Sequence, residues 1–297
     1  MKGLKKEKQK QNKTKYFSPG NVKEAVEILA EIGEEVEVLA GGTDLLVRYY
    51  ERLYDIDYLL DLRLLEGLEG IKLYDDRIEI GARATHSQLE KSEYINKYFP
   101  IIGQAAANVG SPQIRNRGTI GGNIVNASPA GDLLPGMLAY EAKFKLVSAK
   151  EEIIVSAEDF FVEPGKTILK PNQLLTKVIL PKPEENTYSS WIKIGMRKTV
   201  AITTISLALV LKLKRDNNTI KELRTCLGSV APTPLLIREL NREIKGEKID
   251  QLDFNRLGEL VADIISPIDD VRATKEYRKE VARNIMIESL EKVAKLR

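Results

Sequence analysis

The chain has 297 residues, of which 43% are apolar and 30% charged, and its formal net charge is +3. This composition is that of an ordinary globular protein with one to three domains and enough apolar surface for a sizeable core. The single cysteine, Cys226, excludes an internal disulfide and a cysteine-ligated iron–sulfur cluster or zinc ribbon within the chain. The single histidine, His86, excludes most metal sites and catalytic triads, so an enzyme of this composition needs a bound cofactor.

The segment Met1 to Lys15 contains seven lysines and no apolar run after Leu4. We expect a disordered basic tail at residues 1–15, because basic tails are more often solvated than bound to nucleic acid or a membrane. The tail lacks the apolar region of a signal peptide, and the longest apolar run, near Ala201 to Leu211, is too short to span a bilayer. These features predict a cytoplasmic protein with no membrane span and no nucleic-acid partner.

A small α/β unit is predicted over residues 16–66. Asn21 followed by Glu24 is typical of a helix start, and apolar residues then recur at helical spacing until Gly33. The other elements expected in this unit are strands at 36–40 and 58–62 and a short helix at 45–52. The glycine pair Gly41–Gly42 therefore lies at a turn from strand to helix, the usual place for phosphate binding.

A second unit is predicted over residues 67–181. Thr85 with Gln88 indicates a helix start, and His86 in its first turn is most simply a partly exposed residue. Arg115 and Arg117, in the connection at 110–118, are either cofactor or partner contacts or solvated charges. The other expected elements are strands at 71–74, 77–82, 143–147, 152–155 and 173–180, and helices at 100–109 and 133–140.

Prolines at 181 and 183 break the pattern and mark a boundary before a third unit at residues 187–297. The elements expected in this unit are strands at 188–196, 205–213 and 220–230, then helices at 234–241, 254–265 and 274–296. A three-stranded sheet followed by packed helices is an α+β domain.

Two stretches combine paired glycines with small polar residues and an acid. Leu39 to Val47 contains Gly41–Gly42, and Thr119 to Asp132 contains Gly121–Gly122. The second stretch is predicted to be neither a core strand nor a helix, but a turn whose backbone amides bind an anion. Neither stretch is a P-loop or a Rossmann fingerprint. Together they predict a clamp on the two sides of one dinucleotide.

Specific motifs in these stretches resemble a known family. Ala40–Leu45 and Thr119–Ile124, the latter followed by Ala127–Asp132, resemble the two FAD-binding motifs of the flavoprotein subunits of molybdenum hydroxylases. These subunits include the medium subunits of aerobic carbon monoxide dehydrogenase and the FAD subunits of xanthine dehydrogenases. Asp270–Arg278 resembles the family's C-terminal Asp-x-Arg-Ala-Ser-x-x-Tyr-Arg signature. The resemblance runs from about Tyr16 to the C terminus.

The resemblance implies an α+β protein, with a two-subdomain FAD-binding fold of the PCMH/VAO-like type followed by the C-terminal α+β domain. It also implies which residues bind FAD. These residues are Leu39, Ala40, Gly41, Gly42, Thr43, Asp44, Leu45, Thr119, Ile120, Gly121, Gly122, Asn123, Val125, Asp132, Leu175 and Lys193.

Within this set, the first motif would wrap the pyrophosphate with main-chain donors, and the second would do the same from the other side. Val125 would pack against the flavin ring, and Asp132 would bond the cofactor. Leu175 and Lys193 match positions near the adenine or the flavin in some relatives. Leu175 is otherwise ordinary strand core, and Lys193 a surface lysine.

The resemblance further implies an oxidoreductase subunit without catalytic side chains or a metal site of its own. A large molybdopterin subunit and a small subunit with two 2Fe–2S clusters would be separate chains, and FAD would pass electrons to NAD⁺ or another acceptor. Cys226 stands alone, which disfavours the 4-hydroxybenzoyl-CoA reductase branch with its extra cluster. Two alternatives stay open, a free-standing FAD-dependent oxidoreductase of the same fold and a binding module that has lost the flavin.

Overall fold

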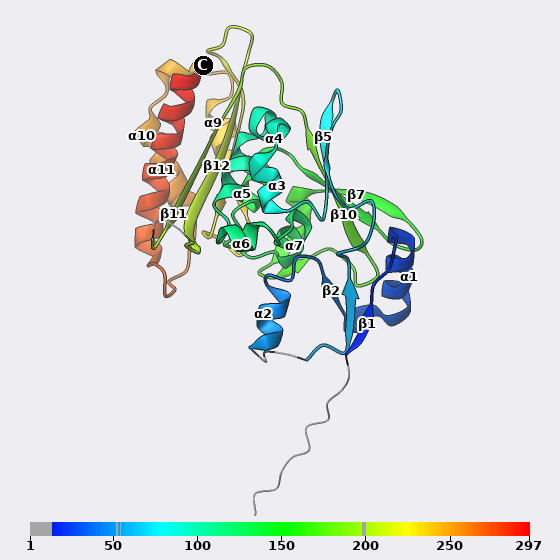
Figure 1. The fold of residues 1–297 in the computed structure, drawn as a ribbon. Helices are drawn as coiled ribbons and strands as arrows, with labels where there is room; N and C mark the ends of the chain where they lie inside the picture. The colour runs from blue at the N-terminus through cyan, green and yellow to red at the C-terminus, as the bar shows by residue number, and fades with distance from the viewer. Residues whose placement is uncertain (1–13, 52, 54, 198–199) are drawn as a thin grey trace, which may run out of the picture.

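The computed structural model describes residues 14–51, 53, 55–197 and 200–297. Nearly all of the expected basic tail, residues 1–13, and position 52 of the expected short helix lie outside the described residues. The chain forms a mixed arrangement of helices and β-sheets (Figure 1), as the sequence predicts. Within the described residues, no helix combines the length and the apolar character that crossing a membrane requires.

The first unit is a parallel three-stranded sheet in the order β1-β3-β2. Its elements are β1 (Lys15–Phe17), α1 (Val22–Ile32), β2 (Val36–Leu39), α2 (Leu45–Tyr50) and β3 (Tyr58–Asp61). The Asn21 side chain accepts a hydrogen bond from the amide of Glu24 at 3.0 Å, which confirms the predicted start of α1. The turn from β2 to α2 contains Gly41–Gly42, also as predicted.

The second unit contains a five-stranded antiparallel sheet in the order β4-β5-β10-β6-β7. Its strands are β4 (Ile71–Leu73), β5 (Arg77–Gly81), β6 (Lys143–Val147), β7 (Glu152–Ser156) and β10 (Leu174–Pro181), and a separate hairpin joins β8 (Phe161–Glu163) to β9 (Lys166–Thr167). The helices are α3 (His86–Lys91), α4 (Glu93–Tyr98), α5 (Pro100–Ala107), α6 (Pro112–Arg115), α7 (Ile120–Asn126) and α8 (Leu134–Ala139).

The prediction that Thr119 to Asp132 forms no helix is wrong. Its first half is helix α7, with the Thr119 side chain accepting a hydrogen bond from the amide of Gly122 at 3.0 Å. Position 121 requires glycine, because a Cβ there would lie only 2.7 Å from the carbonyl oxygen of Ala82. The helix therefore presses its glycine backbone against the end of β5, and this close packing outweighs the poor helix propensity of glycine. Ala127, with a φ of 45°, ends it.

The third unit has a four-stranded antiparallel sheet in the order β11-β12-β13-β14, with three helices. Its elements are β11 (Thr187–Gly195), β12 (Thr203–Leu213), β13 (Ile220–Gly228), β14 (Leu235–Leu236), α9 (Arg238–Ile244), α10 (Phe254–Ile264) and α11 (Lys275–Leu296). The predicted helix at 234–241 is wrong in its first part, because Leu235 and Leu236 extend the sheet by pairing with Leu227 and Cys226. The sheet thus gains a strand that the sequence did not predict.

The sheet of the third unit is buried on both of its faces. Along β12, Ala208 and Val210 belong to the core of the second unit, whereas Leu207 and Leu209 pack with α9, α10 and α11. Figure 1 shows α10 and α11 on one side of β11 and β12, with α3 to α7 on the other side. Burial on both faces explains why residues 207–211 of β12 form a continuous apolar run. The sheet is a wall shared by two hydrophobic cores.

Candidate cofactor site

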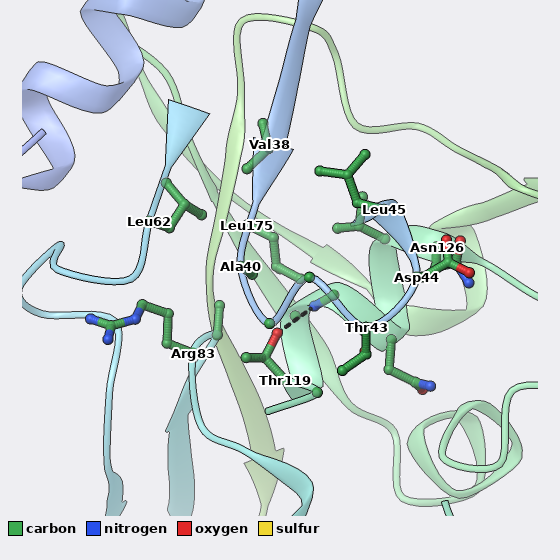
Figure 2. A pocket seen from close by; sticks show the side chains of 18 of the residues that line it. Val38, Ala40, Thr43, Asp44, Leu45, Leu62, Arg83, Thr119, Asn126 and Leu175 are labelled. Atoms are coloured by element: carbon green, nitrogen blue, oxygen red, sulfur yellow. Dashed lines mark hydrogen bonds between the residues drawn. The ribbon is translucent and has the colours of Figure 1, made fainter. Parts of the chain in front are cut away.

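A cavity of about 490 Å³ lies between the two glycine motifs. The first motif contributes the turn between β2 and α2, and the second contributes Gly118, Thr119 and much of α7. The start of β10 and the segment after β5 line it as well. Figure 2 shows Thr43 of the first motif beside Thr119 of the second, with Leu175 of β10 near Ala40. This volume is in the range of cofactor pockets.

Most of the predicted site residues meet in this cavity. Those that line it are Ala40, Gly41, Gly42, Thr43, Asp44, Leu45, Thr119, Gly121, Gly122, Asn123, Val125 and Leu175. Leu39 and Ile120 belong to the same two segments, but their side chains are buried in the protein core. Asp132 and Lys193 do not line the cavity. The two sequence motifs therefore line one cavity.

The first motif contains backbone amides that have no acceptor among the described residues. The amides of residues 40–45 donate no hydrogen bond to any other residue that the structure describes. Gly42 has a φ of +75°, a conformation that L side chains rarely adopt, and helix α2 has no side-chain cap at Asp44. Backbone donors that are not used within the chain are available to a ligand acceptor in the cavity. A run of such amides is an anion-binding cradle.

The second motif differs, because the backbone amides in the first turn of α7 already have hydrogen-bond acceptors within the chain. The amides of Ile120 and Gly121 donate to the carbonyl oxygens of Ala84 and Ala82, and the amide of Gly122 donates to the Thr119 hydroxyl oxygen. A Cβ at Gly122 would meet only the Thr119 hydroxyl oxygen within 4 Å, at 3.0 Å, so its α-carbon faces open space. The second motif thus supplies room for a ligand, while the first supplies the free donors.

The first motif touches the residues that directly precede the second motif. A Cβ at Gly41 would lie 2.2 Å from the carbonyl oxygen of Arg117, so the two backbones are in contact at that point. At the rim, Arg48 of α2 pairs with Asp44 at 2.8 Å and donates a hydrogen bond to Asn126 of α7 at 3.0 Å. Backbone contact and the Arg48 bridge together fix the distance between the two sides of the clamp.

Asp132 and Lys193 form an ion pair at the junction with the third unit. The Lys193 Nζ lies 2.7 Å from an Asp132 carboxylate oxygen and also donates to the carbonyl oxygen of Asn108 at 3.1 Å. Both side chains are only 9% exposed, so the alternative of Lys193 as a surface lysine is wrong. Burial raises the pKa of Asp132, although Lys193 and a hydrogen bond from Thr203 oppose that rise. Asn108, whose carbonyl oxygen accepts from Lys193, is followed by Val109, which lines the cavity, so the pair lies near the cavity.

The C-terminal signature is tied to the same junction. Asp270 pairs with Arg272 and with the buried guanidinium of Arg278, the latter at 2.7 Å. Arg272 donates to the carbonyl oxygen of Thr203, whose hydroxyl donates to Asp132. The signature residues therefore act on the second glycine stretch through the third unit's sheet and do not line the cavity themselves.

His86 is not the partly exposed residue that the sequence suggested, since it is only 3% exposed and lines the cavity. Burial, with a smaller contribution from Arg115, lowers the pKa of His86 to about 4. Arg115 itself pairs with Glu90 at 3.0 Å, and Arg117 has an exposed side chain. Arg115 is thus an internal structural charge, whereas Arg117 offers the site its backbone.

Sequence reasoning missed several lining residues. Glu37 and Val38 directly precede the first motif, and Arg48 and Asn126 lie one helical turn beyond residues that it did assign. Helical spacing could have found the last two. The burial that raises the pKa of Glu37, which Arg48 opposes, depends on the tertiary fold and leaves no local signal. The segment from Gly165 to Gln173 reaches the cavity from far along the chain for the same reason.

Both parts of the chain match known protein families. A family described as "FAD binding domain in molybdopterin dehydrogenase" matches residues 11–183, and "CO dehydrogenase flavoprotein C-terminal domain" matches residues 190–293. The chain is similar to the xanthine dehydrogenase FAD-binding subunit of Escherichia coli, with 30% identity over 89% of this chain and 90% of the relative. It is also similar to the carbon monoxide dehydrogenase medium chain of Afipia carboxidovorans, with 30% identity over 93% and 95%.

Solved structures agree with these relatives. A chain of the carbon monoxide dehydrogenase from Hydrogenophaga pseudoflava has a TM-score of 0.88 and 28% identity, covering 94% of this chain and 96% of that one. The cyanide-inactivated Cu,Mo-CO dehydrogenase gives a TM-score of 0.87 at 30% identity. The chain therefore belongs to the family of FAD-binding subunits of the molybdopterin-containing dehydrogenases, and it is a flavoprotein subunit of an oxidoreductase.

Proposed function

We propose that this chain is the electron-transfer subunit of a multi-subunit molybdenum hydroxylase. It would take electrons from two 2Fe–2S clusters on a small partner subunit and pass them to NAD⁺ or another acceptor, while a large molybdopterin subunit oxidises the substrate. The observation that carries this proposal is the run of unpaired amides at residues 40–45 beside a cavity of about 490 Å³. That arrangement fits the pyrophosphate of FAD, which needs several donors and no catalytic side chain.

The cofactor roles follow from which groups are free. The amides from Ala40 to Leu45 would hold the pyrophosphate, with the Thr43 hydroxyl beside them. The open face of Gly122 would let the cofactor approach α7 closely, since any side chain there would point into the same space. Val125 and Leu175 would supply apolar contacts to the ring systems. Asp132, whose carboxylate is paired with Lys193, would act on the cofactor from the junction beside the cavity.

The remaining chemistry needs little from the protein. Bound FAD supplies the exchange of one and two electrons. Among the described residues, no group of three or more histidine, cysteine or acidic side chains is placed to hold a metal ion. The side chains would position the cofactor and set its electrostatic surroundings. The division into residues 16–66 and 67–181, which hold FAD, and 187–297, which closes the junction, is part of this proposal.

The first test is spectroscopic. The full chain is purified alone and together with its partner subunits, and the visible spectrum is recorded after incubation with FAD. We expect a yellow flavoprotein whose flavin is reduced by the complete complex with substrate, and by NADH if NAD⁺ is the acceptor. A yellow chain that oxidises a substrate without partners would instead favour a free-standing FAD-dependent oxidoreductase. A chain that takes up no FAD in either form would overturn both.

A pair of variants tests the site itself. Gly122→Val places methyl groups in the space left for the cofactor, so we expect loss of FAD retention with an unchanged far-ultraviolet circular dichroism spectrum. Gly20→Val is the matched control, because Gly20 is exposed and a Cβ there would meet only the Glu24 carboxylate, at 3.8 Å. Unchanged flavin content in Gly122→Val would show that the cofactor does not pass α7.

A further inference from the structure

His86 is the one histidine of the chain and lies between the two glycine motifs. Its amide donates to the carbonyl oxygen of Gly118 at 3.0 Å, and the neighbouring Thr85 forms a β-bridge with Thr119. A Cβ at Gly118 would lie 3.0 Å from the His86 Cδ2 and 3.3 Å from the Thr43 hydroxyl oxygen. The imidazole therefore lies beside Gly118, on the side where the Thr43 hydroxyl of the first motif also lies.

The two ring nitrogens have different surroundings. Nδ1 is enclosed and has no hydrogen-bond partner among the described residues. Because the residue lines the cavity while Nδ1 is enclosed, the ring edge that carries Nε2 is the part the cavity reaches. The side chain is buried to 97%, so an imidazole left without partners carries a desolvation cost in the cofactor-free chain. Nε2 is the ring nitrogen at which a ligand acceptor can reach the imidazole.

We propose that His86 is a cofactor-binding residue whose Nε2–H donates a hydrogen bond to the pyrophosphate of FAD, and that FAD binding draws a proton onto its imidazole. This inference rests on the placement of the pyrophosphate at residues 40–45 proposed above.

The charges around the ring decide whether cofactor binding adds a proton to the imidazole or removes one. The charge of Arg115 of α6, which is paired with Glu90 of α3, lowers the pKa of His86, while Glu37, Asp44, Arg48 and Arg83 line the same cavity. The packed face of α5 carries no charged side chain, and Glu93 and Lys97 of α4 are exposed. The cofactor-free site thus favours the neutral imidazole, and the two negative charges of a pyrophosphate would reverse that preference.

The size of the reversal can be compared with the effect of burial. Burial and Arg115 lower the pKa of His86 from 6.5 to about 4. One negative charge about 4 Å away, at an effective dielectric constant of about 20, raises a pKa by about three pH units. The pyrophosphate therefore outweighs the burial and brings the pKa of His86 close to neutrality. Between pH 4 and the new pKa, binding takes up a proton, so FAD binds more tightly as the pH falls.

The single histidine makes a direct measurement possible. The full chain, purified with a tag that contains no histidine, is labelled with ¹⁵N-histidine, and the imidazole resonances are titrated without ligand, with ADP, with FAD and with riboflavin. We expect a pKa near 4 without ligand and a pKa raised by two or more pH units with ADP or FAD. Riboflavin, which lacks the pyrophosphate, should leave the pKa unchanged. A shift with riboflavin but none with ADP would assign the contact to the flavin and overturn the proposal.

Two variants separate the hydrogen bond from the proton. His86→Leu removes both, and we expect at least a tenfold weaker affinity for ADP and FAD at pH 6 by isothermal titration calorimetry. His86→Gln keeps a donor near the position of Nε2 but cannot titrate. It should bind at pH 8 nearly as tightly as the wild type and lose the increase in affinity between pH 8 and pH 5. Wild-type pH dependence in both variants would exclude His86 as its origin.

The outcomes distinguish this inference from the function on which it rests. Wild-type protein that binds ADP without any movement of the His86 pKa would overturn the role of His86 and leave cofactor binding intact. Wild-type protein that binds neither ADP nor FAD would overturn the pyrophosphate site itself.

Discussion

The Nζ of Lys193, on the first strand of the C-terminal sheet, lies 2.7 Å from the carboxylate of Asp132, at the end of the second glycine stretch. Its second contact is the carbonyl oxygen of Asn108, next to a residue that lines the cavity. The pair is nearly buried, so it is shielded from salt and held in one geometry. It couples the position of the second stretch to the C-terminal sheet.

Lys193→Met should destabilise the chain by about 3 kcal/mol, because it leaves the Asp132 carboxylate buried with only the Thr203 hydroxyl as a partner. Without the lysine, the pKa of Asp132 rises further above its usual value. An acid with a raised folded-state pKa favours the folded state when protonated, so the loss should be larger at pH 8 than at pH 5. Urea unfolding at both pH values measures it.

The control for this variant is Lys221→Met, which removes an exposed pair with Glu184. Surface pairs of this kind contribute less than about 1 kcal/mol, so Lys221→Met should leave stability nearly unchanged. Equal losses in the two variants would mean that the Asp132–Lys193 contact has no special role at the junction.

Gly41→Ala should separate the two glycine motifs. The added Cβ would lie 2.2 Å from the carbonyl oxygen of Arg117, so the two backbones must move apart. We expect a loss of about 1 to 3 kcal/mol in stability and a much weaker affinity for FAD, measured by flavin fluorescence quenching. Gly20→Ala, where the nearest atom to the new Cβ is 3.8 Å away, should change neither. Wild-type FAD affinity in Gly41→Ala would show that the first motif can shift without consequence.

Thr119→Val tests the start of α7. The hydroxyl oxygen of Thr119 accepts from the Gly122 amide, and its loss should destabilise the chain by about 1 kcal/mol and weaken FAD binding, since α7 lines the cavity. Thr85→Val removes the equivalent cap of α3, which starts beside the cavity without Thr85 lining it. It should lower the melting temperature by a similar amount and change the FAD dissociation constant less. The reverse order of the two affinities would contradict this assignment.

Asp270→Asn should cost about 3 kcal/mol, because it leaves the buried guanidinium of Arg278 without its carboxylate. Burial would raise the pKa of Asp270, but hydrogen bonds from Arg272 and Arg278 hold it well below its usual range. A lowered acid pKa stabilises the fold above about pH 4 and loses that effect as the pH falls further. The melting temperatures of wild type and variant should therefore differ at pH 7 and converge below pH 4.

Asp216 provides the comparison for Asp270. Its pKa is lowered to about 2 by hydrogen bonds from Thr219 and Asn218, yet it lies in an exposed turn. Asp216→Asn should therefore shift the melting temperature at pH 7 much less than Asp270→Asn does. If both substitutions had the same effect, the ion pair with Arg278 would not be the source of the stability.

Local signals in the sequence were enough for much of the fold. Asn21 and Thr85 each cap the helix that their spacing predicted, because capping depends on residues three positions apart. The shared pattern of paired glycines and an acid predicted that the two motifs meet, and the family resemblance implied the same. Helix α7 was missed because its glycines argue against a helix when only local propensity is considered. The contact of Gly121 with Ala82, which makes glycine necessary there, joins residues far apart in the sequence.

The details of the site depended on tertiary structure. No local pattern shows that the amides of Ile120 and Gly121 are occupied while those of the first motif are free. The burial of His86 likewise results from packing against Gly118, which is distant in sequence. Leu235 and Leu236 were assigned to a helix because two leucines before a helical segment have no distinguishing period, and their pairing with β13 decides their conformation.

The position of β10 also affects the order of events during synthesis. This strand lies between β5 and β6 in the sheet although it follows both in the chain, and it carries Leu175 of the cavity wall. The central strand of the sheet is therefore missing until residue 181 has left the ribosome. At about 5 to 20 residues per second, roughly 3 to 11 seconds separate the synthesis of α7 from that of β10. A nascent chain stalled in this interval has both glycine motifs but lacks the strand that carries Leu175 of the cavity lining.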